Sequence, residues 1–151
     1  MSDADLSVYL AGPVQHKADG GAAWRDAIQE TYSDIRWLDP LAKYNVPVEG
    51  IDIVPEGSDA AGRDGAVTPA DIVNGDKSLL RDADVVLVGY SAVRSIGTPM
   101  EVMWSHDHHK PVVIWVRDGT EVSELSPWYR YHADAIHHSL SDAVNTLLKL
   151  N

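Results

Sequence analysis

The sequence contains no cysteine, few lysines and no long apolar run. Without cysteine the chain forms no disulfide, has no thiolate nucleophile and offers no sulfur ligand to zinc. No apolar segment approaches the ~20 residues that cross a bilayer. The first residues also lack a basic segment followed by an apolar core. We therefore expect no signal peptide, no membrane partner and a cytoplasmic location.

Positive charge is scarce as well. The sequence has 12 lysines and arginines against 23 aspartates and glutamates, which gives a formal net charge of -11. A protein that binds nucleic acid or an anionic membrane needs a basic face, so neither partner is expected. Aspartates outnumber glutamates 17 to 6 and only 5 lysines are present. This composition is typical both of salt-adapted proteins and of ordinary acidic ones.

The 151 residues are otherwise ordinary, with 44% hydrophobic and 23% charged residues, and they predict a single domain spanning 1–151. Short apolar stretches of strand length alternate with segments of helical periodicity. The expected strands are 6–11, 35–38, 84–90, 111–116 and 135–140, and the expected helices are 22–35, 68–82, 98–109 and 141–150, with a helical turn at 128–133. This alternation predicts an α/β fold: a Rossmann-like (flavodoxin-like) parallel sheet of about five strands with helices on both faces.

Residues 41–67 interrupt the alternation with a long stretch rich in glycine, proline and aspartate. In a compact domain a connection of this length is typical of a functional or mobile segment. A disordered surface insertion is an equally good interpretation of the same composition.

The segment Ser95–Glu101 follows a buried strand and begins a helix. Thr98 suits the N-cap, Pro99 the first helical position and Glu101 the third. The carboxylate would then lie at a helix N-terminus beyond a strand end, where it stays ionised and can act as a nucleophile. The pattern is also that of a capping box, so a purely structural role is the alternative.

Four features should meet at the carboxyl ends of the strands: the turn 9–13, Asp76, the segment 95–101 and the loop after strand 111–116. Asp76 is interpreted either as a solvated helix acid or as the partner of Glu101. Two carboxylates across a pocket are what cleavage of a glycosidic bond uses, one attacking the sugar and one moving a proton. His106 and His109 share a helical face, but no third ligand is placed, so no metal is expected.

Several motifs in order resemble the nucleoside 2-deoxyribosyltransferase family, which includes the 2'-deoxynucleoside 5'-monophosphate N-glycosidases. The matching segments are Tyr9–Pro13, Asp76–Val86, Gly97–Glu101 and Lys110–Val112. The resemblance implies a Rossmann-like fold, no cofactor, a small nucleoside or nucleotide substrate, and a homodimer or larger homo-oligomer.

The same resemblance assigns roles to single residues. Glu101 is the implied nucleophile on C1' of the sugar, Tyr9 orients it, and Asp76 contacts the sugar or base and helps to protonate the leaving base. The implied substrate-binding residues are Gly12, Pro13, Ser95, Ile96, Gly97 and Thr98. The cytokinin-activating phosphoribohydrolases share the Gly-Thr-x-x-Glu element, but their fuller glycine-rich motif is absent.

Ser95 stands where the transferase branch usually has an acid that holds a free 5'-hydroxyl. A serine is similar to the branch that hydrolyses monophosphates. An acid there would repel a phosphate, whereas a hydroxyl and helix-start amides attract it, with Lys17, Arg63 or Arg94 as possible helpers. The prediction is therefore hydrolysis of a (2'-deoxy)nucleoside 5'-monophosphate to base and sugar phosphate. Base exchange and a non-catalytic nucleotide-binding module are the alternatives.

Overall fold

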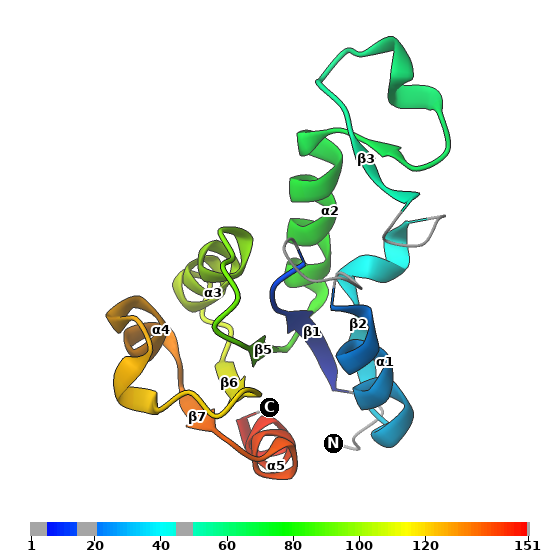
Figure 1. The fold of residues 1–151 in the computed structure, drawn as a ribbon. Coiled ribbons are helices and arrows are strands. Elements are labelled where there is room, and N and C mark those ends of the chain that lie inside the picture. The colour runs from blue at the N-terminus through cyan, green and yellow to red at the C-terminus, as the bar shows by residue number, and fades with distance from the viewer. Residues whose placement is uncertain (1–5, 15–20, 45–49, 151) are drawn as a thin grey trace.

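The protein is described by a computed structural model that covers residues 6–14, 21–44 and 50–150. A five-stranded sheet, parallel throughout, forms its centre, with strand order β2-β1-β5-β6-β7 (Figure 1). The strands of this sheet are β1 (Ser7–Ala11), β2 (Arg36–Leu38), β5 (Val85–Tyr90), β6 (Val112–Val116) and β7 (Ala135–His137). This order is the flavodoxin-like one, in which the chain reverses direction across the sheet between β1 and β5.

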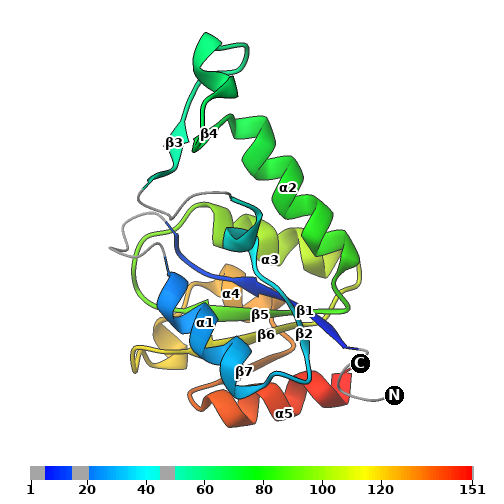
Figure 2. The same ribbon diagram turned by 90° about the vertical axis from the view of Figure 1, so that its right-hand side faces the viewer.

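Helices cover both faces of the sheet (Figures 1 and 2). They are α1 (Ala22–Thr31), α2 (Pro69–Asp82), α3 (Gly97–Asp107), α4 (Pro127–His132) and α5 (Leu140–Leu150), with short 3-10 turns η2 (Pro40–Lys43), η4 (Asp59–Gly62) and η5 (Val122–Glu124). One hydrophobic cluster joins the sheet to α1 and α5, and a second joins it to α2 and α3. The central strands are buried on both faces, which explains their almost continuous apolar sequences.

The predicted fold class is confirmed, and the element boundaries differ by a few residues. The last strand ends at His137 rather than at 140, because Leu140 already begins α5. The predicted helix 68–82 begins with a capping box: Thr68 accepts from the backbone of Asp71 at 3.2 Å, and the Asp71 carboxylate accepts from the backbone of Thr68 at 3.0 Å. No helix in the described part of the chain is long and apolar enough to cross a membrane.

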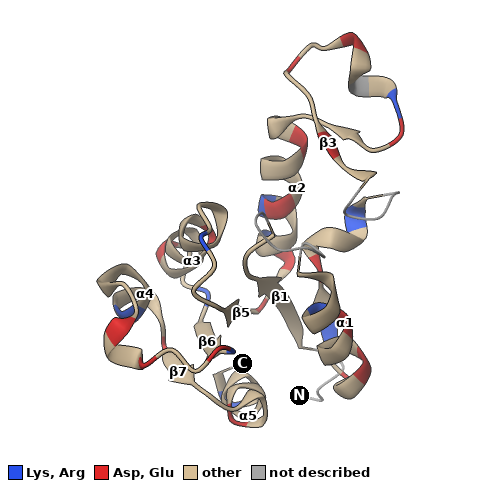
Figure 3. Cartoon of the chain, viewed as in Figure 1, with Lys and Arg blue, Asp and Glu red and all other residues tan. Residues whose placement is uncertain are grey.

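The stretch 41–67 is more ordered than its composition predicts, although residues 45–49 lie outside the described part. Strands β3 (Asp52–Ile53) and β4 (Ala66–Val67) pair in parallel, with η4 between them. Together they form an arm, residues 50–68, that projects away from the main sheet in both views (Figures 1 and 2). Figure 3 shows acidic residues along this arm and along α2.

Candidate active site

A cavity of about 390 Å³ opens at the carboxyl ends of β1 and β5. This is the point where the strand order reverses, and ligands of open α/β sheets bind there. Its walls come from the end of β1, the segment before α3, the first turns of α2 and the base of the arm. The volume lies within the range of small-molecule sites.

Glu101 lies in the second turn of α3, not at its start. The helix begins at Gly97, its N-cap is Ile96, and no side chain caps it at that position. The predicted N-cap at Thr98 is therefore wrong, and the capping box of the alternative interpretation does not form. Ser95 binds this turn instead: its Oγ accepts from the backbone of Thr98 at 3.2 Å and donates to Thr98 Oγ1 at 2.8 Å. The Glu101 carboxylate is thus left to face the cavity.

Tyr9 and Glu101 form a hydrogen-bonded pair at the bottom of the cavity. The Tyr9 hydroxyl donates to Glu101 Oε2, and the tyrosine is 1% exposed. Burial, and then the negative charge of Glu101, raise the pKa of Tyr9 far above its ordinary value. Tyr9 therefore stays a protonated donor, and its position on the central strand fixes the direction of the carboxylate.

The carboxyl group of Glu101 is harder to ionise than its place on a helix predicts. Burial raises its pKa to about 8, the hydrogen bond from Tyr9 acts in the opposite direction, and the charge of Asp76 adds to the rise. The sequence-based expectation of a fully ionised Glu101 is therefore wrong near neutral pH. Loss of hydration outweighs the helix dipole because the carboxylate lies one turn inside α3.

Asp76 lines the same cavity from α2, and Lys43 donates to its carboxylate. The side chains of both residues are about a quarter exposed, at 22% for Lys43 and 24% for Asp76. Burial raises the pKa of Asp76, and the ammonium of Lys43 works against that rise. Asp76 is thus a pocket carboxylate with a bound counter-ion, not the solvated helix acid of the alternative interpretation.

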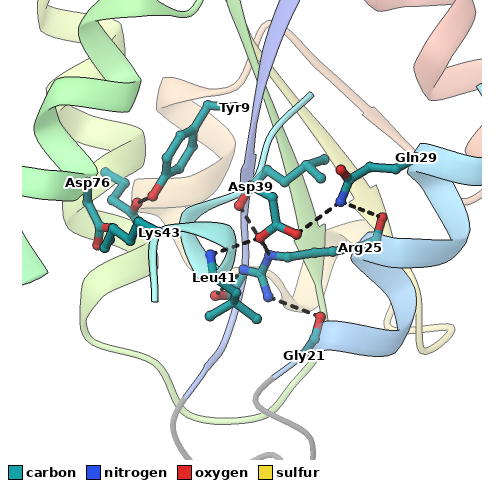
Figure 4. A network of polar contacts seen from close by, with 11 residues as sticks. Tyr9, Gly21, Arg25, Gln29, Asp39, Leu41, Lys43 and Asp76 are labelled. Carbon is teal, nitrogen blue, oxygen red and sulfur yellow. Dashed lines mark hydrogen bonds and ion pairs between the residues drawn. The ribbon is translucent and has the colours of Figure 1, made fainter. Parts of the chain in front are cut away.

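Arg25 is a second cation that the sequence analysis missed. It is 0% exposed and donates to the carbonyl oxygen of Gly12 at 3.1 Å. It also donates to the carbonyl oxygen of Gly21 at 3.1 Å (Figure 4). A side chain at Gly12 would lie 2.7 Å from the ring of Trp24, so only glycine fits there. The sequence signal that could have indicated these contacts is an arginine among apolar residues of a predicted helix, because a buried arginine needs hydrogen-bond partners.

The remaining predicted binding residues mostly line the cavity. Gly12, Ser95, Ile96, Gly97 and Thr98 do so, whereas Pro13 is buried beside the cavity without lining it.

The proposed phosphate helpers are not brought together here. Arg63 pairs with Asp52 on the arm at 3.8 Å, Arg94 lines a neighbouring hollow, and Lys17 lies outside the described residues. Among the residues that are described, no three metal-binding side chains meet.

Two solved structures share this fold over nearly their whole lengths. One is a conserved protein from Enterococcus faecalis V583, with a TM-score of 0.67 and 13% identity, covering 95% of this chain and 98% of that one. The other is a 2-deoxyribosyltransferase from the psychrotolerant bacterium Bacillus psychrosaccharolyticus, with a TM-score of 0.67 and 17% identity, covering 93% and 95%. No protein-family model and no curated protein matches the chain.

Proposed function

We propose that the protein is an N-glycosidic-bond enzyme that moves a 2-deoxyribosyl group from one base to another, with Glu101 as the nucleophile. The observation that carries the proposal is the buried Tyr9 hydroxyl donating to Glu101, in a cavity that Asp76 also lines. The motif order of the sequence and the fold shared with a 2-deoxyribosyltransferase support the same reaction.

In the first half-reaction a Glu101 oxygen attacks C1' of the sugar. The bond between C1' and the base nitrogen breaks, its electron pair stays with the base, and the base takes up a proton. The sugar is then an ester of Glu101. In the second half-reaction the nitrogen of another base attacks C1', loses its proton and releases the Glu101 carboxylate. This is the retaining two-carboxylate mechanism applied to a nitrogen leaving group.

Burial of Glu101 suits this chemistry. A carboxylate with little hydration is a stronger nucleophile, and it also stabilises the positive charge that develops on the sugar ring. Asp76 is proposed to anchor the sugar or the base and to move the proton to the leaving base.

Hydrolysis of a nucleoside 5'-monophosphate is the second candidate, and Ser95 favours it. At position 95 the cavity presents an uncharged hydroxyl, not a carboxylate, next to the first turn of α3, where a phosphate is favoured. In that case water replaces the second base, and the products are free base and sugar phosphate.

Chromatography of the products decides among these functions. The protein is incubated with nucleosides or their monophosphates, with and without an added acceptor base, beside Glu101→Gln. Transfer gives a new nucleoside only with the acceptor, and hydrolysis gives free base without it. If the unaltered protein binds nucleotides tightly but releases no base, it is a binding module, and both catalytic proposals are wrong.

A further inference from the structure

Lys43 contacts the cavity carboxylate Asp76 without lining the cavity itself. It is the last residue of η2, and its ammonium pairs with the Asp76 carboxylate on α2. Nothing in the proposed reaction uses Lys43 directly. Its contact with a residue of the reaction nevertheless gives it a way to act on the site through Asp76.

Gly75 leaves the room for this approach. A Cβ atom built on Gly75 would lie 3.1 Å from both Cδ and Cε of Lys43 and 3.4 Å from its Nζ. Gly75 is in the interior of α2, where glycine weakens a helix relative to any residue except proline. The absent side chain of Gly75 lets the lysine stem pass α2 at the residue before Asp76. This accounts for a residue of poor helix propensity at that position.

The segment that carries Lys43 is itself held in place. Asp39 caps η2 by accepting from the backbone of Leu41 at 2.9 Å. The same carboxylate accepts from Gln29 at 2.9 Å and lies 4.0 Å from Arg25, both on α1 (Figure 4). Polar contacts thus run from α1 through η2 to Asp76. The contacts of Asp39 with α1 hold the η2 segment that carries Lys43.

We propose that Lys43 is a positioning residue, which fixes the Asp76 carboxylate at the cavity wall through an ion pair that Gly75 makes room for. Its test by enzyme kinetics rests on the proposed function. Its test by titration of the carboxyl groups rests only on the ion pair. One set of contacts thereby accounts for the glycine within α2, for the polar contacts that hold η2, and for the ion pair of Asp76.

The ion pair also has an electrostatic consequence for both acids. Lys43 lowers the pKa of Asp76 and, from further away, that of Glu101. The ionisable groups that interact with these two acids in the described part of the chain include Lys43 on η2, Arg25 on α1, Tyr9 on β1, Tyr44 at the end of η2 and Tyr129 on α4, besides the acids themselves on α2 and α3. Without Lys43 both acids become harder to ionise, and Asp76 loses the partner that sets its direction.

The direct experiment is a titration of the side-chain carboxyl groups by carbon-13 NMR, in the protein without ligand. We expect Lys43→Met to raise the pKa of Asp76 and of Glu101, Lys43→Arg to restore much of the unaltered behaviour, and Lys149→Met to change neither. Lys149 is exposed on α5, so its variant controls for the loss of one positive charge. Unchanged titration of Asp76 in Lys43→Met would overturn the proposal.

The kinetic experiment uses the base-release or transfer assay. Lys43→Met should lower kcat/KM by ~10- to 100-fold through a misplaced carboxylate. Without Lys43 the pKa of Glu101 rises further, so less of it is ionised at about pH 6, whereas at about pH 9 most of it is still ionised. The loss should therefore be greater at about pH 6 than at about pH 9. A loss that is equal at every pH and is not rescued by Lys43→Arg indicates a merely structural lysine and contradicts the proposal.

Gly75→Val tests the same contact with every charge retained. The valine methyl groups occupy the path of the Lys43 stem, while valine is a better helix residue than glycine. We expect activity to fall as in Lys43→Met, with equal or greater thermal stability. Ser78→Val, at an exposed position of α2, is the matched control and should keep full activity.

The two proposals fail separately. If the unaltered protein neither releases nor transfers a base, the proposed function is wrong, and the carboxyl titration still decides whether Lys43 holds Asp76. If the protein is active and both Lys43→Met and Gly75→Val keep its activity and pH profile, the positioning role is wrong and the proposed function stands.

Discussion

The two walls of the cavity are built differently. On one side, Tyr9 on the buried central strand β1 and Glu101 on α3 contact each other. On the other side, η2, β3 and the start of α2 supply Asp76 and exposed apolar residues such as Ile53, which is 52% exposed. The first wall holds the half-buried reactive carboxylate by a hydrogen bond from the buried Tyr9. The second is partly solvated, and its acid is held by a counter-ion.

This difference separates chemistry from recognition. A nucleophile needs a fixed direction and low hydration, which a buried strand and helix supply. Contacts to a variable part of a substrate tolerate an exposed and adjustable wall. Changes in the sheet wall, formed by β1 and α3, should therefore act on turnover. In the arm wall, formed by η2, β3 and the start of α2, changes at the apolar residues should act on substrate binding and choice, whereas Asp76 is proposed to act on turnover.

The largest effect is expected for Glu101→Gln. The amide keeps the shape of the side chain and removes the nucleophile, so turnover should fall by ~10³-fold or more. Steady-state assays measure the loss, and circular dichroism checks that the fold is intact. Near-normal turnover of a folded variant would contradict the role of Glu101.

The pH profile gives the next largest effect. Burial raises the pKa of Glu101 to about 8, so kcat/KM should rise about tenfold per pH unit until about pH 8 and then level off. The free energy of unfolding has the opposite trend. The folded protein binds the Glu101 proton more tightly than the unfolded chain, so this contribution is present below pH 4.5 and is lost as the pH rises through about 8.

Glu101→Gln separates the two trends. It removes the titrating group, so above about pH 8 it should be more stable than the unaltered protein by up to about 5 kcal/mol, because each pKa unit between 4.5 and about 8 corresponds to about 1.4 kcal/mol. Denaturant unfolding at acid and alkaline pH measures the difference. Equal stability of the two proteins at every pH would show that burial of Glu101 carries no energetic cost.

Asp76→Asn is expected to have a smaller effect, of roughly 10- to 100-fold on turnover. Because Asp76 is proposed to move a proton to the leaving base, the loss should be greater for bases that leave poorly without protonation. Nucleosides with activated and unactivated bases are compared in the same assay. An equal loss for both kinds leaves Asp76 with an anchoring role only.

Sequence reasoning was more successful for the sheet wall than for the arm wall, for physical reasons. Alternating apolar runs and helical periods are local signals, so they predicted the parallel sheet and placed Tyr9 and the segment before α3 at one edge. Asp76 was placed at the same edge by its position on the second predicted helix, and motif order supported it. Lys43 and Arg25 depend on contacts between distant segments, such as Lys43 over Gly75, which leave no local pattern. The start of α3 was misplaced because Ser95, rather than Thr98, binds the first turn.

Ser95→Ala probes the sheet wall where it meets the substrate. If Ser95 contacts a 5'-phosphate, its loss should weaken use of the monophosphate by ~1–3 kcal/mol and affect the plain nucleoside much less. Ser95→Asp should repel the phosphate and favour a free 5'-hydroxyl. Competition between a nucleoside and its monophosphate measures both changes. A preference of the unaltered protein for the nucleoside would favour transfer over hydrolysis.

The smallest effect is expected in the arm wall, for Ile53→Ser. Ile53 lines the cavity from β3, but half of its surface is already exposed, so its removal costs little folding energy. If the arm wall acts in recognition, the variant should raise KM by about two- to tenfold with kcat nearly unchanged, because ground state and transition state lose the same apolar contact. Val73→Ser, which is exposed on α2 and does not line the cavity, is the control. A fall in kcat with constant KM would show that the apolar residues of the arm wall also take part in the chemistry, and their separation from the sheet wall would not hold.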